Sequence, residues 1–304
     1  MEVNRIFWEG GYDLVLSIGQ VVPHEVAGMA NYSKNVFVGI GGRQMINKTH
    51  MLGAVCGMEK ALGEDHAPVR QVFDYAQARF LKDRPVVYVL TVTTEHKGDV
   101  ALRGLYIGDS RTAFERAVAL SQRLNITYLD RPARKVVAYL DPLELKTTWV
   151  GNKGIYRSRM AIADGGELLL LAPGIARFGE SDEIDAAIRA FGYRGRDYVL
   201  RHYRQGAFEN RLMVAAHLIH GSSDGRFRIT YATNPALLSK AEVEAVGFSH
   251  LDLDAALARY DPAKLQDGFQ TLPDGEEIYF IRTPALGLWR LRGGRQAAEG
   301  GTHP

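Results

Sequence analysis

Apolar residues recur along the chain in two patterns, as short segments rich in apolar residues and at helical spacing. The short segments predict strands at residues 12–22, 85–92, 102–108, 134–141, 166–174, 227–233 and 277–283. Residues 12–22 alternate little and are interpreted as a strand buried on both faces of a parallel sheet. Helical spacing predicts helices at residues 44–62, 67–81, 112–124, 149–163, 182–191, 196–204, 208–220, 240–246 and 253–260.

Strands that alternate with helices predict an α/β fold with mainly parallel sheets flanked by helices. A chain of 304 residues exceeds one typical domain. The segment 125–135 is short and polar and contains Pro132, so we place a domain boundary there. This predicts an N-terminal α/β domain over residues 1–130 and a C-terminal α/β domain over 131–292. Residues 293–304 have almost nothing apolar to bury and are expected to be disordered.

Charge and composition exclude several classes of protein. Lys and Arg number 37 against 35 Asp and Glu, and they are scattered, so we expect no nucleic-acid partner. No apolar run is long enough to span a membrane, and the first residues lack the pattern of a signal peptide. A single cysteine, Cys56, suits a reducing compartment and is interpreted as a buried, inert thiol. We therefore expect a cytoplasmic protein.

The candidate chemistry begins in the stretch VVPHEVAGMANYSKNVFVGIGG, residues 21–42. His24 and Lys34 follow a predicted parallel strand, at the sheet edge where α/β folds bind ligands. Histidine titrates near neutrality, and a lysine amine can form a covalent bond. His50, on the next predicted helix, could converge with them. Lys34 could equally be a solvated surface lysine and His24 an ordinary structural histidine.

A second candidate lies in WVGNKGIYRSRMAIADGG, residues 149–166. Lys153, Tyr156, Arg157 and Arg159 gather near the start of a predicted helix. Cations are electrostatically unfavourable at that end of a helix, so their placement favours an anion site. The alternative is a solvated basic face. His217 and His220 could share one helix face, but without a third ligand they are interpreted as core or surface histidines.

These segments together resemble the nickel-dependent lactate racemase family of 2-hydroxyacid racemases and epimerases. The resemblance covers roughly residues 3–180 and is carried by DLVLSIGQVVPHEVAG, by the lysine ten residues after the histidine, by INKTHML and by GNKGIYRSRMAIADGGELLLLAPG. It implies an active site in the cleft between two domains. It also implies a nickel pincer nucleotide, a pyridinium mononucleotide that holds nickel through two sulfur atoms and one carbon, supplied by accessory proteins.

The resemblance assigns roles to four residues. Lys34 would be the covalent tether of the cofactor, and His50 would supply the protein's ligand to nickel. His24 would be one of two acid/base histidines, and Lys153 would hold the substrate. The implied reaction inverts C2 of a 2-hydroxy acid or sugar acid by proton-coupled hydride transfer, which needs a hydride acceptor that amino-acid side chains lack.

The chain also departs from the family pattern. A glycine-rich stretch usually precedes the tether, but Asn31 and Tyr32 stand there. A family glutamine three residues before the substrate lysine is Val150, which indicates a substrate other than lactate. The family pattern, with its second acid/base histidine and an arginine motif, begins upstream of Met1. The chain is therefore expected to be a fragment, to start at a wrongly assigned methionine, or to be a shortened homologue.

Two other functions are kept as alternatives. A truncated, catalytically weak or inactive homologue could bind a ligand or a partner. A nicotinamide-dependent oxidoreductase is less favoured, because the glycines of VGIGGRQ do not follow the dinucleotide-binding spacing.

Overall fold

The computed structural model describes residues 2–96, 99–285 and 287–293. The chain forms two compact units. Unit 1 comprises Met1–Ile126 with Arg211–Ala216, and unit 2 comprises Thr127–Asn210 with the residues from His217 onward. The predicted disordered tail, apart from Gly293, lies outside the described residues.

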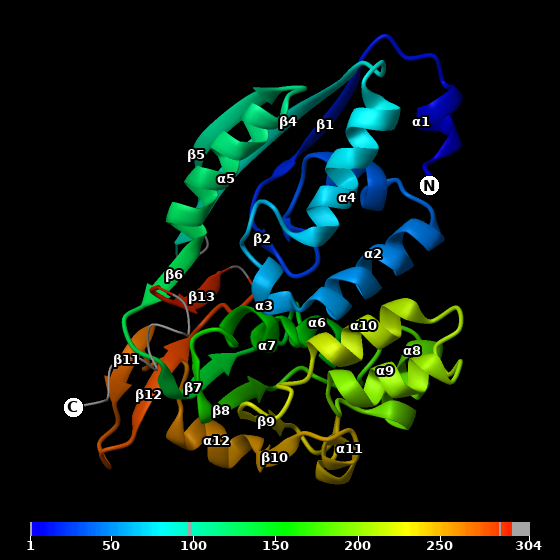
Figure 1. The fold of residues 1–304 in the computed structure, drawn as a ribbon. Coiled ribbons are helices and arrows are strands. Elements are labelled where there is room, and N and C mark those ends of the chain that lie inside the picture. Colours follow the sequence, from blue (N-terminus) through cyan, green and yellow to red (C-terminus); the bar gives the residue numbers. More distant parts are fainter. Residues whose placement is uncertain (1, 97–98, 286, 294–304) are drawn as a thin grey trace, which may run out of the picture. The chain divides into compact units, whose positions relative to one another are not determined.

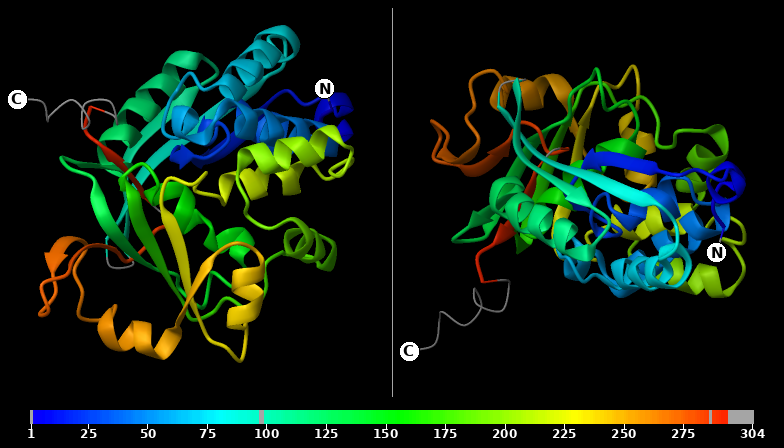
Figure 2. Two further views of the ribbon diagram at one scale, coloured as in Figure 1. Left: turned by 60° about the horizontal axis from the view of Figure 1, so that its bottom comes forward. Right: turned by 90° about the horizontal axis from the view of Figure 1, so that it is seen from above.

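Unit 1 is built around a sheet of three strands, β1 (Val15–Gln20), β4 (Val86–His96) and β5 (Asp99–Gly108). β1 pairs parallel to β4, and β4 pairs antiparallel to β5. Helices α4 (Pro68–Ala76) and α5 (Arg111–Asn125) lie on one face of this sheet (Figures 1 and 2). Between helices and sheet lies a core of fully buried side chains that includes Phe73, Leu90, Val92 and Phe114.

The other face of this sheet is apolar and exposed. Leu16, Ile18, Leu105 and Ile107 are each more than half exposed. Ile18 and Ile107 flank Val89 in register, so the apolar side chains form a continuous surface across the three strands. The prediction that residues 12–22 form a strand buried on both faces is therefore wrong for β1, whose residues alternate between half-buried and exposed.

Short elements connect β1 to β4 in unit 1. They are the hairpin strands β2 (Pro23–His24) and β3 (Gly28–Met29), the π-helical turns η1 (Asn35–Gly39) and η2 (Gln77–Leu81), and the helices α2 (Arg43–Cys56) and α3 (Met58–Ala61). The single helix predicted over 44–62 is broken, because Gly57 adopts a φ of 92° between α2 and α3. Helix α1 (Arg5–Glu9) has no counterpart in the sequence prediction.

Unit 2 contains a six-stranded sheet in the order β10 (Ser249–Asp252), β9 (Arg228–Thr233), β8 (Ile162–Ala172), β7 (Ala133–Tyr139), β12 (Glu277–Ile281) and β11 (Gly268–Thr271). The neighbouring pairs from β10 to β12 are parallel, and β11 pairs antiparallel to β12. This sheet is visible at the lower left of Figure 2, left. The prediction of an α/β fold with mainly parallel sheets flanked by helices is confirmed.

Helices cover both faces of the unit 2 sheet. Helix α12 (Leu253–Arg259) packs on one face against a core that contains Val137, Leu169 and Phe280. Helix α7 (Lys153–Ser158) packs on the other face, where Gly154 lies against Leu170. Leu168 to Leu171 are at most 1% exposed, as expected of a strand buried on both faces.

The helix predicted over 149–163 is shorter than expected. It consists of α6 (Thr148–Gly151) and α7, and β8 already begins at Ile162, where Ala133 of β7 pairs with it. The remaining elements are α8 (Asp182–Phe191), α9 (Arg196–Arg204), α10 (Leu212–His220), α11 (Lys240–Ala245), β6 (Ile126–Leu129) and β13 (Leu288–Leu291). Among the described residues, no helix has the length and apolar character needed to cross a membrane.

Candidate functional site

The β2–β3 hairpin of unit 1 carries His24. Pro23 pairs with Met29 and His24 with Gly28, so the turn between the strands is tight. Inside this turn, His24 Nδ1 accepts hydrogen bonds from the backbone N–H groups of Val26 at 3.1 Å and Ala27 at 3.3 Å. The ring is thereby fixed by the chain that follows it.

These two hydrogen bonds also determine where the proton of His24 lies. Nδ1 is an acceptor, so in the neutral ring the proton is on Nε2. Nε2–H is a hydrogen-bond donor, whereas a general base needs an unprotonated nitrogen. In this arrangement His24 is suited to donate a hydrogen bond to a substrate oxygen. The role of proton acceptor would require the ring to turn.

Lys34 ends the 29–34 loop, the segment that starts at Met29, the last residue of β3, and immediately precedes η1. Its side chain is half-buried, and in the described part of the chain its ammonium group has no hydrogen-bond or salt-bridge partner. Burial lowers the pKa of Lys34, and the charge of Arg70 lowers it further, while Glu25 opposes both. A larger fraction of the amine is therefore neutral, and hence nucleophilic, than in an exposed lysine.

His50 lies in the middle of α2. Its Nδ1 is 2.7 Å from the carbonyl oxygen of Ile46, one helical turn earlier, so Nδ1 carries the proton that this carbonyl accepts. Nε2 is then the unprotonated nitrogen, the form of imidazole that binds metals. Burial lowers the pKa of His50, so this neutral form persists to lower pH.

Glu25 links these two residues. Its carboxylate raises the pKa of both Lys34 and His50, and Lys34 in turn lowers that of His50, so the three groups are electrostatic neighbours. The charges of Lys34, His50 and Glu25 therefore influence one another within unit 1, and His24 directly precedes Glu25 in the chain. Glu25 was not among the residues predicted from the sequence, and its position directly after His24 is the signal that indicates it.

The 29–34 loop contains two consecutive residues in the left-handed region. Asn31 has a φ of 70° and Tyr32 a φ of 57°, a conformation that glycine adopts readily and a bulky residue rarely does. The chain thus keeps a glycine-like backbone just before Lys34, although the expected glycines are replaced. The Tyr32 ring stacks on Phe114 and packs against Tyr88, which offsets the strain of the backbone.

In unit 2 the predicted anion site is reduced to one residue. Arg157 is buried and donates to the carbonyl of Gly287, and Arg159 donates to the carbonyls of His220 and Ser222. Lys153 is half-buried at the start of α7, and its ammonium group has no hydrogen-bond or salt-bridge partner among the described residues. Lys153 is therefore better placed than either arginine to receive a carboxylate.

Around His217 lies a buried polar cluster that supports the same helix. Tyr156 from α7 contacts His217 Nδ1 at 2.9 Å, and Tyr193 contacts Nε2 at 2.8 Å. Trp149 from α6 stacks on the imidazole at 4.1 Å between ring centroids. Both His217 and His220 are buried, which confirms their interpretation as core histidines. The cluster anchors α6 and α7, and thereby Lys153.

Comparison with known proteins supports the fold. No family model and no curated protein matches the sequence. A crystal structure of a protein from Thermotoga maritima superposes with a TM-score of 0.75 at 27% identity, covering 95% of this chain and 69% of that one. The lactate racemase apoprotein from Thermoanaerobacterium thermosaccharolyticum gives a TM-score of 0.69 at 18% identity, covering 95% of this chain and 65% of that one. The chain spans about two thirds of each solved structure and has a lactate-racemase-like fold.

Proposed function

We propose that this chain belongs to a racemase or epimerase that inverts C2 of a 2-hydroxy acid or sugar acid with a nickel pincer nucleotide. The observation that carries the proposal is the combination of Lys34 and His50 in unit 1, whose charges influence each other and are both influenced by Glu25. One is a half-buried amine without a hydrogen-bond partner in the described chain, and the other is an imidazole whose Nδ1 is held by a backbone carbonyl.

The donor set fits such a cofactor. Within the described residues there is no group of three or more His, Cys, Asp and Glu side chains that could hold a metal ion. A metal bound here would need most of its ligands from another molecule. A nickel complex that already contains sulfur and carbon ligands needs only one imidazole ligand and one covalent attachment from the protein. His50 and Lys34 provide these two groups.

The residues of unit 1 would attach and orient the cofactor. The lowered pKa of Lys34 favours the neutral amine, which would condense with a thiocarboxyl group of the nucleotide, forming the thioamide C–N bond as the C–O bond breaks and water leaves. The carbonyl of Ile46 keeps the proton of His50 on Nδ1 and its Nε2 available as a ligand. When bound, the cofactor supplies the hydride acceptor that inversion at C2 requires.

We propose Lys153 and His24 as the residues that hold the substrate. The ammonium group of Lys153 suits the carboxylate of a hydroxy acid, since a charge-assisted hydrogen bond satisfies both groups. His24 would donate from Nε2 to the oxygen on C2. Val150 cannot make the hydrogen bond of the family glutamine, so we propose a substrate other than lactate. Accessory proteins that supply the cofactor are the expected partners, and the predicted cleft between domains stays a prediction.

The test is covalent loading. The protein is purified from a strain that makes the cofactor, and its intact mass and nickel content are measured. We expect a mass increase, and peptide mapping should place it on Lys34. The increase should be lost in Lys34→Ala and retained in Lys48→Ala, which replaces an exposed lysine of α2. Loaded protein is then incubated with a panel of 2-hydroxy and aldonic acids. An unmodified mass without bound nickel would contradict the proposal.

A second candidate is a ligand-binding protein without catalysis. The hydrogen bonds that hold His24 Nδ1 favour it, because they withhold the base from the reaction. This function predicts binding of hydroxy acids, measured by calorimetry, with no inversion of any of them by the loaded protein. Inversion that is abolished by His24→Ala would exclude it.

A further inference from the structure

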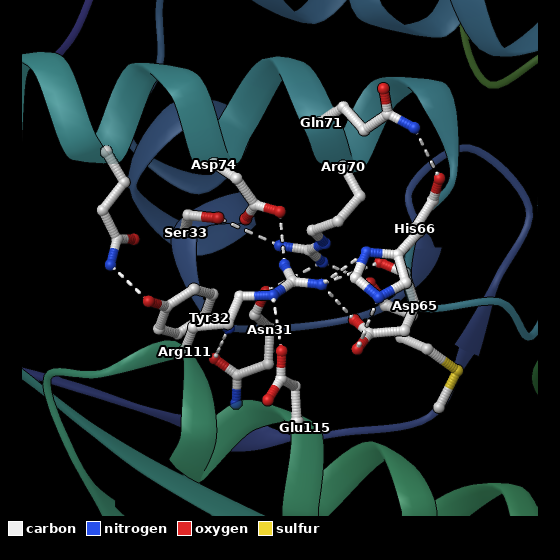
Figure 3. Close-up of polar contacts among 12 residues, drawn as sticks. Asn31, Tyr32, Ser33, Asp65, His66, Arg70, Gln71, Asp74, Arg111 and Glu115 are labelled. Carbon is white, nitrogen blue, oxygen red and sulfur yellow. Dashed lines mark hydrogen bonds and ion pairs between the residues drawn. The ribbon is translucent and has the colours of Figure 1, made fainter.

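Arg70, on α4, is an unusual buried charge. Its side chain is fully buried, and none of its hydrogen bonds goes to a carboxylate in the described part of the chain. Asp74, the nearest candidate on the same helix, instead forms an ion pair with Arg111 (Figure 3). Burial lowers the pKa of Arg70 to about 10, which leaves the guanidinium charged at neutral pH. Burying a charge is costly unless it is paired and hydrogen-bonded, so a specific role is expected.

All three hydrogen bonds of the guanidinium go to the loop that precedes Lys34. One terminal nitrogen donates to Ser33 Oγ at 3.0 Å (Figure 3). The other donates to the carbonyl oxygens of Met29 at 2.6 Å and Asn31 at 3.3 Å. The planar guanidinium of Arg70, with its two terminal nitrogens as a fork, thus bridges the 29–34 loop from Met29 to Ser33. A lysine at position 70 could not reproduce this set of hydrogen bonds, because its single ammonium nitrogen cannot occupy the positions of both terminal nitrogens of the guanidinium.

Two aromatic rings also lie near the guanidinium. It lies 4.6 Å from the centroid of Phe114 and 5.8 Å from that of Phe73, distances at which a cation is attracted to a ring face. Phe114 also stacks on Tyr32. The same ring therefore supports both the fork and the strained residue of the loop. Conformations such as those of Asn31 and Tyr32 persist only where the surroundings determine them strongly.

We propose that Arg70 is the positioning residue of the proposed cofactor tether: its guanidinium fork holds the 29–34 loop so that Lys34 stays half-buried beside Glu25 and His50. This inference rests on the proposed role of Lys34. Arg70 does not touch the reacting atoms and acts through the loop. Neither the spacing of the motif nor its composition points to it, because it follows Lys34 by 36 positions.

The deciding variant is Arg70→Lys, which keeps the positive charge and loses the fork. The rate at which trinitrobenzenesulfonate modifies Lys34 in the cofactor-free protein is measured against pH by peptide mass spectrometry. If the loop loosens, Lys34 leaves its buried site beside Glu25 and His50, and the midpoint of its profile rises toward that of an ordinary lysine. A higher midpoint lowers the fraction of neutral amine at neutral pH, about tenfold for each pH unit. Loading with the cofactor in the producing strain should fall in parallel.

The matched control is Arg111→Met. Arg111 is a partly buried arginine that forms ion pairs with Asp65, Asp74 and Glu115, and among the described residues it makes no hydrogen bond to the 29–34 loop. The Arg111→Met substitution should lower the free energy of unfolding and leave the midpoint of the pH profile of Lys34 modification unchanged. An unchanged midpoint in Arg70→Lys, or an equal shift in Arg111→Met, would overturn the proposal. If Arg70→Lys does not fold, Ser33→Ala removes one acceptor of the fork and should give a smaller shift of the same sign.

The two readouts separate this inference from the proposed function. If the unmodified sequence never acquires the cofactor, the proposed function fails, while the pH profile of Lys34 still decides whether Arg70 positions it. If loading occurs and is insensitive to Arg70→Lys, the tether is correct and the positioning role is wrong.

Discussion

The imidazole Nδ1 of His50 lies 2.7 Å from the carbonyl oxygen of Ile46, so one turn of α2 both fixes the ring and selects its tautomer. We expect His50→Ala to release nickel while the covalent adduct on Lys34 is retained. Burial lowers the pKa of His50, so protons compete weakly for its Nε2. In the loaded protein, nickel should stay bound on acidification to a lower pH than imidazole in water would hold it. Metal analysis after buffer exchange measures both effects, and full nickel retention in His50→Ala would refute the ligand role.

The buried amine of Lys34 should make the fold less stable than it could be. Its folded pKa is lowered, so protonation is disfavoured in the folded state and the cost is greatest at neutral pH. Lys34→Met should raise the free energy of unfolding by roughly 1 kcal/mol at pH 7, and the gain should shrink as pH rises through the lowered pKa toward 10.5. Denaturant titration measures this. The exposed Lys48→Met should change stability by less than about 0.5 kcal/mol. A destabilised Lys34→Met would show that the amine is well accommodated.

His217 gives unit 2 an acid-sensitive core. Burial lowers its pKa to about 3, and the charge of His220 adds to the effect. The unfolded chain takes up a proton below about pH 6.5, and the folded protein does not until about pH 3. The contribution of neutral His217 is complete above pH 6.5 and is lost as pH falls toward 3. His217→Gln should reduce the slope of unfolding free energy in this window by about 1.4 kcal/mol per pH unit. An NMR titration in which the His217 ring protonates near pH 6 would contradict this.

The sequence predicted the buried elements well, because periodicity reports burial. The run that contains Leu168 to Leu171 was predicted as a strand, and its side chains are buried. The same type of run at Leu16 and Ile18 predicted burial that the described chain does not provide on one face. Periodicity indicates that a surface is apolar, and it does not reveal which segment covers it.

The candidate site was predictable only in part. His24, Lys34 and His50 lie close together along the chain, and histidine and lysine are residue types that commonly act as acid/base groups, metal ligands and nucleophiles. The contributions of Arg70 and Glu25 depend on tertiary contacts: Arg70 reaches the 29–34 loop from α4, and Glu25 acts through space. Spacing in the sequence contains no signal for such contacts. The same limit explains why Arg159, whose hydrogen bonds go to distant carbonyls, was grouped with Lys153.

The exposed apolar face of the unit 1 sheet should bind hydrophobic dyes and promote self-association. Ile107 is 61% exposed and lies beside Val89 in register. Ile107→Thr should lower ANS fluorescence and change the free energy of unfolding by less than about 0.5 kcal/mol. Leu90, one position from Val89 and 0% exposed, is the matched control. Leu90→Ala should cost about 2–5 kcal/mol. If Ile107→Thr is as costly as Leu90→Ala, this face is covered in solution.

Gly28 connects the hairpin of His24 to the rest of unit 1, and its replacement should be among the most damaging in the chain. It has a φ of 79°, and a Cβ atom there would lie 2.1 Å from the carbonyl oxygen of Glu64. Gly57 offers the comparison, since its φ is 92° and a Cβ would meet nothing within 4 Å. Gly57→Ala should cost only the backbone strain of a residue with positive φ, about 1–3 kcal/mol.

Gly28→Ala carries the same strain and must in addition displace the backbone near Glu64. Because Gly28 pairs directly with His24, that displacement should also loosen the turn in which Val26 and Ala27 donate to Nδ1. We therefore expect a larger loss of unfolding free energy than in Gly57→Ala, together with faster amide exchange at Val26 and Ala27. Equal losses in the two variants would show that the hairpin can move away from Glu64 at little cost, and the placement of His24 would then not depend on Gly28.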